Sequence, residues 1–416
     1  MKNSLIALRS GAAAAFAALS LTATAAGAGA AGSGPAGNAF YTPPSPLAPG
    51  AHGDLIWARP LTDAAALPSA AQNVLVLYHS TSVGGKDVAV SGTVAIPKGT
   101  PPRGGWPIVS WAHGTTGLGA DCAPSRDEAS GPAHSYLTLV EKMLDAWVAR
   151  GYVVVQTDFE GLGAPGVHPY LIGVSEGRGV VDMVRAARRL DPQIGTRYVI
   201  SGHSQGGQAA LFAAAIAKDW APELTPLGDV ALAPASHVLP YVQGLMKTTA
   251  PTLGFAFMPY FLVGVAAADP AVQIDRILTP AAVAKVPDAQ RLCIDALRAP
   301  GSWGTLVPAD QFRSDADTAA FFRDLAANDP GPLKIAMPTL LAQGTADTVV
   351  GPIATDLLGQ QLCGNGVPLA YRTYDGVTHR GLLDASLADT EAWVDARFAG
   401  SMATSNCATL PHAAKG

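Results

Sequence analysis

The stretch from Tyr198 to Lys218 reads YVISGHSQGGQAALFAAAIAK and contains a G-x-S-x-G pentapeptide centred on Ser204. A short run with β-branched residues precedes the pentapeptide and an Ala-rich run follows it, so the pattern predicts a strand, a tight turn and a helix. Glycines stand two residues before and two residues after the serine, where small residues let the helix pack close to the strand. The stretch therefore predicts a nucleophilic serine at position 204.

Strand and helix patterns alternate along most of the chain. From Asn73 onward, runs rich in β-branched residues are followed by longer helical patterns, which predicts a mostly parallel central sheet with helices on both faces. The first two strands should form an antiparallel pair joined by Gly84-Gly85. We expect strands at 72–80, 88–97, 106–112, 152–157, 198–202, 228–233, 339–343 and 370–374, and helices at 136–150, 180–190, 209–218, 352–361 and 387–398. Together with the turn at Ser204, this order predicts the α/β-hydrolase fold.

The alternation stops in a long segment rich in Pro, Ala and Phe. Loops of such length are uncommon in compact domains unless they are functional, so we interpret the segment as an inserted helical cap or lid. We expect it to contain helices at 288–297 and 315–327. The predicted domains are a hydrolase core of 31–234 and 332–416, and a cap or lid of 235–331.

The composition and the N-terminal residues restrict the class of protein. Charged residues make up 14% of the 416 residues and the formal net charge is −5, so nothing indicates nucleic-acid binding. Lys2 and Arg9 precede an apolar run at 11–21, and small residues follow, as in a secretory signal. The run is shorter than the ~20 residues that a bilayer requires, so we expect no transmembrane anchor. We predict that 1–30 is a cleaved signal peptide and that the protein is secreted, to the extracellular space or the periplasm.

Four cysteines are an even number in a chain that is expected to reach an oxidising compartment. This predicts two disulfides among Cys122, Cys293, Cys363 and Cys407, with three possible pairings. Free buried thiols are the alternative. The spacing of Cys and His does not match a zinc site, so we expect no metal.

A serine hydroxyl needs a base to take its proton, and histidine can serve near neutral pH. Among nine histidines, His379 follows the last predicted strand, which is where the base lies in this fold. His52 and His412 lie near the chain ends, His203 is part of the pentapeptide, and His113 precedes a glycine-rich loop. We predict that His379 is the catalytic base; a surface loop histidine is the alternative.

The base needs a carboxylate that orients its imidazole and stabilises the imidazolium. Asp347 lies between a predicted buried strand and a helix, in the sequence QGTADTVV at 343–350. Asp375 is the nearest rival, but it lies on the same loop as His379, and we interpret it as a turn residue. Asp158 and Glu160 precede the nucleophile in the chain and are expected to organise their own loop.

Acyl transfer also needs backbone N–H groups that stabilise the oxyanion. Gln205 follows the nucleophile at the start of a helix, where free N–H groups and the helix dipole favour negative charge. The second donor should come from the loop after the third strand, which reads WAHGTTG from Trp111 to Gly117. We predict Thr115 as that donor; an ordinary glycine turn is the alternative.

These motifs resemble the secretory lipase family of fungal and bacterial triacylglycerol lipases. The resemblance rests on WAHGTTG at 111–117, CAPS at 122–125, DFEGLG at 158–163, HPY at 168–170, the pentapeptide, and the contexts of Asp347 and His379. It spans nearly the whole chain after the signal. It implies an α/β-hydrolase core with a helical lid, hydrolysis of lipid or other carboxylic esters, and no cofactor. It also implies that Cys122 pairs with Cys293 and that Cys363 pairs with Cys407.

The motifs and the resemblance are consistent with two classes of function. The first is a serine carboxylic-ester hydrolase, a lipase or esterase acting on acylglycerols or related lipid esters through an acyl-enzyme. The same triad also serves acyltransferases and polyester hydrolases. The second class is a secreted, non-catalytic binding protein of the same fold. We expect an aromatic-rich stretch at 253–265 to line an acyl-chain tunnel or to contact a lipid surface; a buried helix is the alternative.

Overall fold

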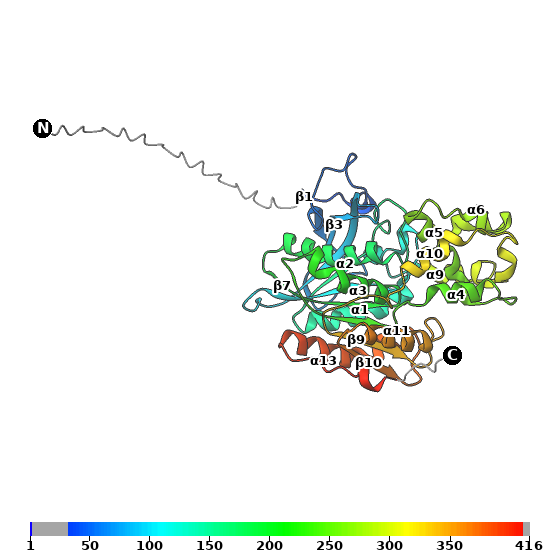
Figure 1. Ribbon diagram of the computed structural model, residues 1–416. Coiled ribbons are helices and arrows are strands. Elements are labelled where there is room, and N and C mark those ends of the chain that lie inside the picture. The colour runs from blue at the N-terminus through cyan, green and yellow to red at the C-terminus, as the bar shows by residue number, and fades with distance from the viewer. Residues whose placement is uncertain (2–31, 411–416) are drawn as a thin grey trace. The chain divides into compact units, whose positions relative to one another are not determined.

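The computed structural model describes Met1 and residues 32–410, so the predicted signal peptide at 1–30 lies, apart from Met1, outside the described residues. Within 32–410, ten strands form one sheet in the order β1-β2-β3-β4-β6-β5-β7-β8-β9-β10. Figure 1 shows helices packed around this sheet. The strands are β1 (Gly32–Ser33), β2 (Leu55–Pro60), β3 (Ala70–Thr81), β4 (Asp87–Pro97), β5 (Trp106–Ala112), β6 (Val153–Thr157), β7 (Ile194–His203), β8 (Thr225–Leu232), β9 (Thr339–Gly344) and β10 (Leu369–Tyr374).

The sheet is mostly parallel, which confirms the sequence-based prediction. β3 and β4 form the expected antiparallel pair, with Thr81 opposite Asp87, and β4 is also antiparallel to β6. From β6 through β5, β7, β8 and β9 to β10, neighbouring strands are parallel. The carboxyl ends of these strands therefore meet at one edge, where open α/β sheets bind their ligands.

Two strands at one end of the sheet are absent from the sequence-based prediction. β2 pairs antiparallel with β3, and β1 pairs parallel with β2 over two residues. β2 reads LIWARP, and none of its six residues is fully buried. A strand without a buried face gives little hydrophobic periodicity, so its sequence does not stand out.

Helices cover both faces of the sheet, as predicted. Strand β6 contributes Val153 and Val155 to the core on one face and Val154 to the core on the other, which explains its unbroken valine run. The first face packs against α2 (Gly173–Leu190), α3 (Gln205–Trp220) and α11 (Pro352–Gly364). The second face packs against α1 (His134–Ala149), α12 (Leu382–Ala385) and α13 (Leu387–Phe398). No helix within residues 32–410 is both long enough and apolar enough to cross a bilayer.

Helix α2 begins at Gly173, whereas the sequence predicts a start at 180. Glycine has a low helix propensity. The first turns of the helix contain Gly173, Gly177 and Gly179 and therefore do not show a helical pattern in the sequence. The structure shows why glycines stand there. A Cβ atom on Gly173 would lie 2.3 Å from the ring of Phe212, and one on Gly177 would lie 2.8 Å from the nitrogen of Ala213. The glycines let α2 pack closely against α3.

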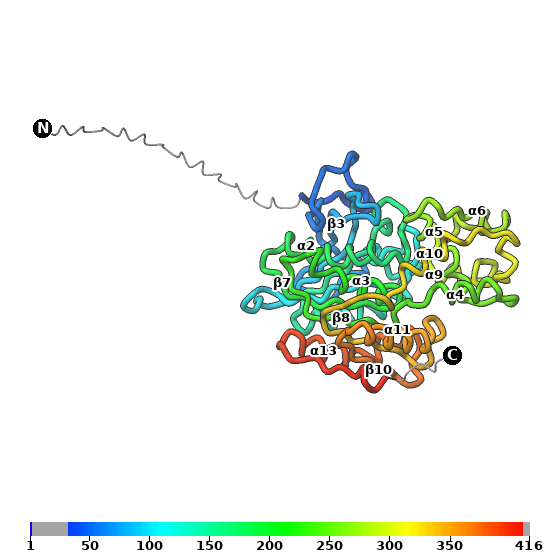
Figure 2. The backbone as a smooth tube through the Cα atoms, viewed as in Figure 1, coloured from blue at the N-terminus to red at the C-terminus, as the bar shows by residue number. Residues whose placement is uncertain are grey.

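The inserted segment 235–331 contains helices and supplies most of one apolar cluster, including Phe255, Leu262 and Trp303; the cluster also includes Leu118 and 170–172. Figure 2 shows the segment in green to yellow, gathered to one side of the sheet. Its helices are α4 (Val238–Leu245), α5 (Met258–Ala268), α6 (Ile274–Ile277), α7 (Pro280–Val283), α8 (Val286–Ala289), α9 (Ile294–Arg298) and α10 (Ala319–Ala327), with short 3-10 helices η4 (Leu253–Phe257), η5 (Trp303–Thr305) and η6 (Pro308–Gln311). Elsewhere lie η1 (Gly37–Tyr41), η2 (Ala120–Cys122), η3 (Pro124–Arg126) and η7 (Cys407–Thr409). That the segment acts as a lid stays a prediction.

The prediction of a single helix at 288–297 is wrong, because two separate helices, α8 and α9, occupy this region. Between them, Cys293 has an extended backbone and forms a β-bridge with Gly117. A residue held in an extended conformation by a partner strand cannot continue a helix. The second predicted helix, at 315–327, is confirmed over α10.

Two disulfides connect distant parts of the chain, in the pairing that the resemblance implies. Cys122 and Cys293 join the loop after β5 to the inserted segment. Cys363 and Cys407 join α11 to the C-terminal residues. The first disulfide therefore ties the predicted oxyanion loop to the predicted lid.

Removing the Cys122–Cys293 disulfide should destabilise the protein more than removing the Cys363–Cys407 disulfide. The paired cysteines are 171 residues apart in the first and 44 in the second, and a longer closed loop restricts the unfolded chain more. We expect Cys122→Ala/Cys293→Ala to lower the free energy of unfolding by roughly 2–5 kcal/mol, and by about 1 kcal/mol more than the other double variant. Urea unfolding measures both losses, and an equal or reversed order would contradict the prediction.

Candidate active site

The turn between β7 and α3 holds Ser204 in a strained conformation. Its φ and ψ are 60° and −119°, which is rare for a residue other than glycine. The Ser204 N–H donates to the carbonyl of Leu232 at 2.8 Å, and its carbonyl accepts from the N–H groups of Gln208 and Ala235. These bonds fix the backbone of a residue that lines two cavities. Ser204 is 8% exposed.

Glycine is required on both sides of this turn. A Cβ atom on Gly202 would lie 2.1 Å from the carbonyl oxygen of Gly206. A Cβ atom on Gly206 would lie 1.9 Å from the carbonyl oxygen of Ala112, at the end of β5. Because backbone atoms cannot move aside as a flexible side chain can, no larger residue fits at either position.

The structure brings the predicted base and acid together. His379 Nδ1 lies 2.6 Å from Asp347 Oδ2. The other carboxylate oxygen, Oδ1, accepts from the N–H groups of Val349 and Val350 at 2.8 and 2.9 Å. In a Ser-His-Asp triad the carboxylate accepts the N–H of Nδ1, and the contact here joins the same two groups. His379 Nε2 is then free to accept a proton.

Ser204 and His379 line the same cavity. Within residues 32–410 no hydrogen bond joins their side chains, and such bonds are often long before substrate binds. The catalytic role of the three residues stays a prediction. The rival Asp375 accepts from the hydroxyl of Thr345 and is not among the cavity residues.

A chain of hydrogen bonds links the predicted oxyanion loop to the predicted base. The Gly114 N–H donates to the Tyr136 hydroxyl at 2.9 Å, which lies 3.0 Å from His203 Nδ1. His203 Nε2 lies 3.1 Å from the carbonyl oxygen of His379. Burial lowers the pKa of His203 well below its usual value, so this imidazole is neutral and can donate from Nε2 and accept at Nδ1. Sequence analysis places Tyr136 at the start of a predicted helix and assigns it no role in the site.

The two predicted oxyanion donors lie in the segments next to the nucleophile, one in α3 and one in the loop after β5. Gln205 begins α3, so its N–H group has no acceptor within the helix. Thr115 lies in the loop after β5 and lines the cavity with Ser204. Among the described residues its N–H group has no acceptor, and its Oγ1 lies 2.6 Å from the hydroxyl of Tyr170. Both N–H groups are thus available for an oxyanion, a role that stays a prediction.

The side chain of Gln205 is fixed by two buried residues to which sequence analysis assigned no role, although His168 belongs to the HPY motif. Its Nε2 lies 2.8 Å from His168 Nε2 and 2.8 Å from Glu176 Oε1. His168 Nδ1 lies 2.8 Å from the carbonyl oxygen of Glu160, so Nδ1 carries the proton and Nε2 accepts. Burial lowers the pKa of His168 to about 3 and raises the pKa of Glu176 to about 8. Both are therefore neutral at pH 7, and no ion pair forms between them.

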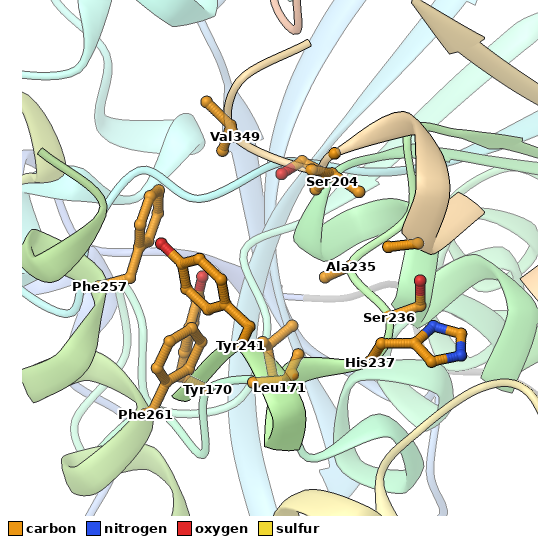
Figure 3. A pocket seen from close by; sticks show the side chains of 14 residues that line it. Tyr170, Leu171, Ser204, Ala235, Ser236, His237, Tyr241, Phe257, Phe261 and Val349 are labelled. Carbon is orange, nitrogen blue, oxygen red and sulfur yellow. The ribbon is translucent and has the colours of Figure 1, made fainter. Parts of the chain in front are cut away.

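Two cavities meet at Ser204. The apolar cavity contains four aromatic rings grouped on one side, and Ser236 and His237 lie on the other (Figure 3). Its lining residues are Tyr170, Leu171, Ser204, Ala235, Ser236, His237, Val238, Tyr241, Phe257, Phe261, Val349, Val350, Gly351 and Ala354. The polar cavity is lined by Gly114, Thr115, Tyr136, His203, Ser204, Phe257, Ile294, Arg298, Thr348, Val349, Thr378, His379 and Arg380. The nucleophile thus has an apolar side and a polar side.

Comparisons relate the chain to known lipases. Residues 131–297 match the family described as secretory lipase. Lipase A of Moesziomyces aphidis is 29% identical over 201 residues, which are 47% of this chain and 42% of that protein. A probable inactive lipase of Mycobacterium tuberculosis is 25% identical over 394 residues, which are 89% of this chain and 84% of that protein. The chain therefore spans less than half the length of the first of these relatives.

Solved structures share the fold. Candida antarctica lipase A has a TM-score of 0.77 at 19% identity, over 90% of this chain and 89% of that chain. A rice cell wall degrading esterase from Xanthomonas oryzae has a TM-score of 0.66 at 21% identity, over 84% of this chain and 98% of that chain. These likenesses confirm the predicted α/β-hydrolase fold.

Gly206→Ala should prevent the turn at Ser204 from forming. Its Cβ atom would overlap the backbone of Ala112, so we expect a loss of at least about 3 kcal/mol in the free energy of unfolding, or no soluble protein. Gly364→Ala is the control, because nothing lies within 4 Å of its added Cβ atom. Thermal unfolding compares the two, and a Gly206→Ala protein as stable as the control would contradict the geometry.

Glu176→Gln should change how stability depends on pH. Burial raises the pKa of Glu176 from 4.5 to about 8, so the folded protein keeps a proton that the unfolded chain releases. The contribution of this proton to stability is complete below pH 4.5. It is lost progressively as the pH rises from 4.5 to about 8. Between pH 5 and pH 8 the wild type should lose roughly 3 kcal/mol relative to Glu176→Gln.

Urea unfolding at several pH values measures this difference. The exposed Glu128 provides the control variant Glu128→Gln. A constant stability difference between wild type and Glu176→Gln across this range would show that Glu176 is ionised in the folded protein.

Proposed function

We propose that this relative of the secretory lipases hydrolyses carboxylic esters, with Ser204 as nucleophile, His379 as base and Asp347 as the acid that orients the base. The observation that carries the proposal is the buried His379–Asp347 hydrogen bond of 2.6 Å beside the cavity that Ser204 also lines. The strained turn supports it, because such conformations persist where function requires them.

The reaction proceeds in two half-reactions. His379 Nε2 takes the proton of the Ser204 hydroxyl as its oxygen attacks the ester carbonyl carbon. The N–H groups of Thr115 and Gln205 stabilise the negative charge on the carbonyl oxygen. His379 then protonates the leaving alcohol oxygen, and an acyl-enzyme forms on Ser204. Water, deprotonated by His379, releases the acid and restores the hydroxyl.

The two cavities divide the substrate between them. The leaving oxygen must come close to His379, which lines the polar cavity and is not a lining residue of the apolar one. The alcohol part therefore occupies the polar cavity, and the acyl chain occupies the apolar cavity among Tyr241, Phe257 and Phe261. This assignment matches an enzyme of lipid or other apolar acyl esters.

Apolar side chains around the apolar cavity support contact with a lipid–water interface. Tyr241 lines the cavity and is 39% exposed, and Leu253, in the same inserted segment, is 59% exposed. Ile353 is 75% exposed and lies between the lining residues Gly351 and Ala354. In our proposal these side chains meet the lipid surface, and 235–331 is the lid that covers the cavity.

Secretion with loss of 1–30 belongs to the same proposal. Two disulfides suit an oxidising compartment, and the family match is to secretory lipases.

The second candidate function is a non-catalytic protein of the same fold. It is favoured by the Mycobacterium tuberculosis relative, which is called a probable inactive lipase and aligns with 89% of this chain. Against it stand the hydrogen-bonded His379 and Asp347 and a serine on the strained turn. An inert scaffold has no need of that strain.

Ser204→Ala should abolish ester hydrolysis while the protein stays folded. We expect the release of p-nitrophenol from butyrate and longer acyl esters to fall by at least about 1000-fold, because the covalent intermediate cannot form. Ser401→Ala changes an exposed serine and is the control. A fluorophosphonate should label Ser204 in the wild type and the control. Hydrolysis that persists in Ser204→Ala would refute the mechanism, and an unlabelled wild type without hydrolysis would favour the non-catalytic function.

A further inference from the structure

Two arginines line the polar cavity beside the nucleophile. Arg298 comes from the end of α9, in the inserted segment, and Arg380 follows His379. The lining residues of this cavity include no aspartate and no glutamate. The wall that faces the proposed alcohol part of the substrate is therefore positively charged.

The guanidinium of Arg298 lacks a hydrogen-bonding partner. Among the described residues none of its donors makes a hydrogen bond, and its Nε is buried. Its nearest carboxylate oxygen, Asp295 Oδ1, lies 3.8 Å from Nη1, and the group stacks over the ring of Phe257 at 5.0 Å. The side chain is 23% exposed. A guanidinium has five N–H donors, and leaving them unpaired in a largely buried position is costly.

The nearby negative charge is already engaged. Asp295 Oδ1 accepts from Arg380 Nη2 at 2.8 Å, and Asp295 Oδ2 accepts from the Ser135 hydroxyl at 2.8 Å. Asp347 is committed to His379. Two arginines thus share one carboxylate that is not part of the cavity wall. Burial, and then the charge of Arg380, lower the pKa of Arg298.

We propose that the polar cavity binds an anionic group on the alcohol part of the ester, with Arg298 as its principal donor. The inference rests on the proposed function, which places the alcohol part beside His379. A carboxylate or a phosphate can accept two parallel hydrogen bonds from a guanidinium. The substrate class is therefore an apolar acyl ester of a hydroxy acid or of a phosphorylated alcohol.

The specificity constant kcat/KM for matched butanoyl esters tests this inference. The anionic substrates are the butanoyl esters of 3-hydroxypropanoate and of 2-hydroxyethyl phosphate, and the neutral one is that of 3-hydroxypropanamide. All three share the acyl group. We expect the better anionic ester to be preferred over the amide by roughly 10- to 100-fold, the effect of a charge-assisted hydrogen bond. The faster of the two identifies the group as carboxylate or phosphate.

Substitution of Arg298 should remove the preference. In Arg298→Gln the ratio of anionic to neutral kcat/KM should approach one, and Arg298→Lys should keep part of it, since it retains the charge without the planar fork. Arg291→Gln is the matched control, because Arg291 lies in the same inserted segment, pairs with Asp288 and is 69% exposed. Its ratio should equal that of the wild type.

The outcomes separate this inference from the proposed function. A wild-type ratio near one, with Ser204-dependent hydrolysis of all three esters, would overturn the inference and leave the ester hydrolase intact. A preference that persists in Arg298→Gln would overturn the role of Arg298. Absence of Ser204-dependent hydrolysis of any ester would overturn the proposed function itself. The ratio of anionic to neutral kcat/KM is measured on the wild type alone. The inference can therefore be tested even if Arg298→Gln does not fold.

Discussion

The close approach of Gly206 to the backbone of Ala112 is the constraint on which the site depends. A Cβ atom at Gly206 would lie 1.9 Å from that carbonyl oxygen, so the first turn of α3 sits directly against the end of β5. The loop that carries Thr115 begins where β5 ends, and Gln205 begins α3, so the same approach brings these two residues to the region of Ser204. The strained turn at Ser204 and the position of the two N–H groups therefore both depend on the absence of side chains at Gly202 and Gly206.

Several buried, uncharged side chains connect the segments around the nucleophile. His113, His168 and His203 all have pKa values lowered by burial, and burial raises the pKa of Glu176. Each of these groups makes directed hydrogen bonds without bringing a net charge near Ser204. In the proposed mechanism, stabilisation of the oxyanion is therefore left to backbone dipoles, which need no reorganisation when charge develops.

The sequence predicted much of this arrangement, and its failures have physical reasons. The order of strands after the turn, the helices on both faces and the positions of Ser204, Asp347 and His379 follow from hydrophobic periodicity and chain order. Periodicity says nothing about Glu176 or Tyr136, because a buried polar residue at the end of a helix looks like a surface residue until its partner is known. The start of α2 at Gly173 could not be predicted for a related reason. The glycine is needed there because α3 packs against it, and the sequence alone does not show that neighbour.

The charges that remain around Ser204 are unevenly placed. Asp347 lies behind His379, and Arg298 and Arg380 line the polar cavity. In the proposed mechanism the alcohol therefore departs on the positive side. As the bond between acyl carbon and alcohol oxygen breaks, negative charge develops on that oxygen. A fixed positive charge nearby lowers the energy of this step for any alcohol, and the gain is larger in a cavity shielded from water. The same guanidinium would thus serve departure of the alcohol and recognition of an anionic substituent on it, which explains why a costly unpaired arginine is kept beside the nucleophile.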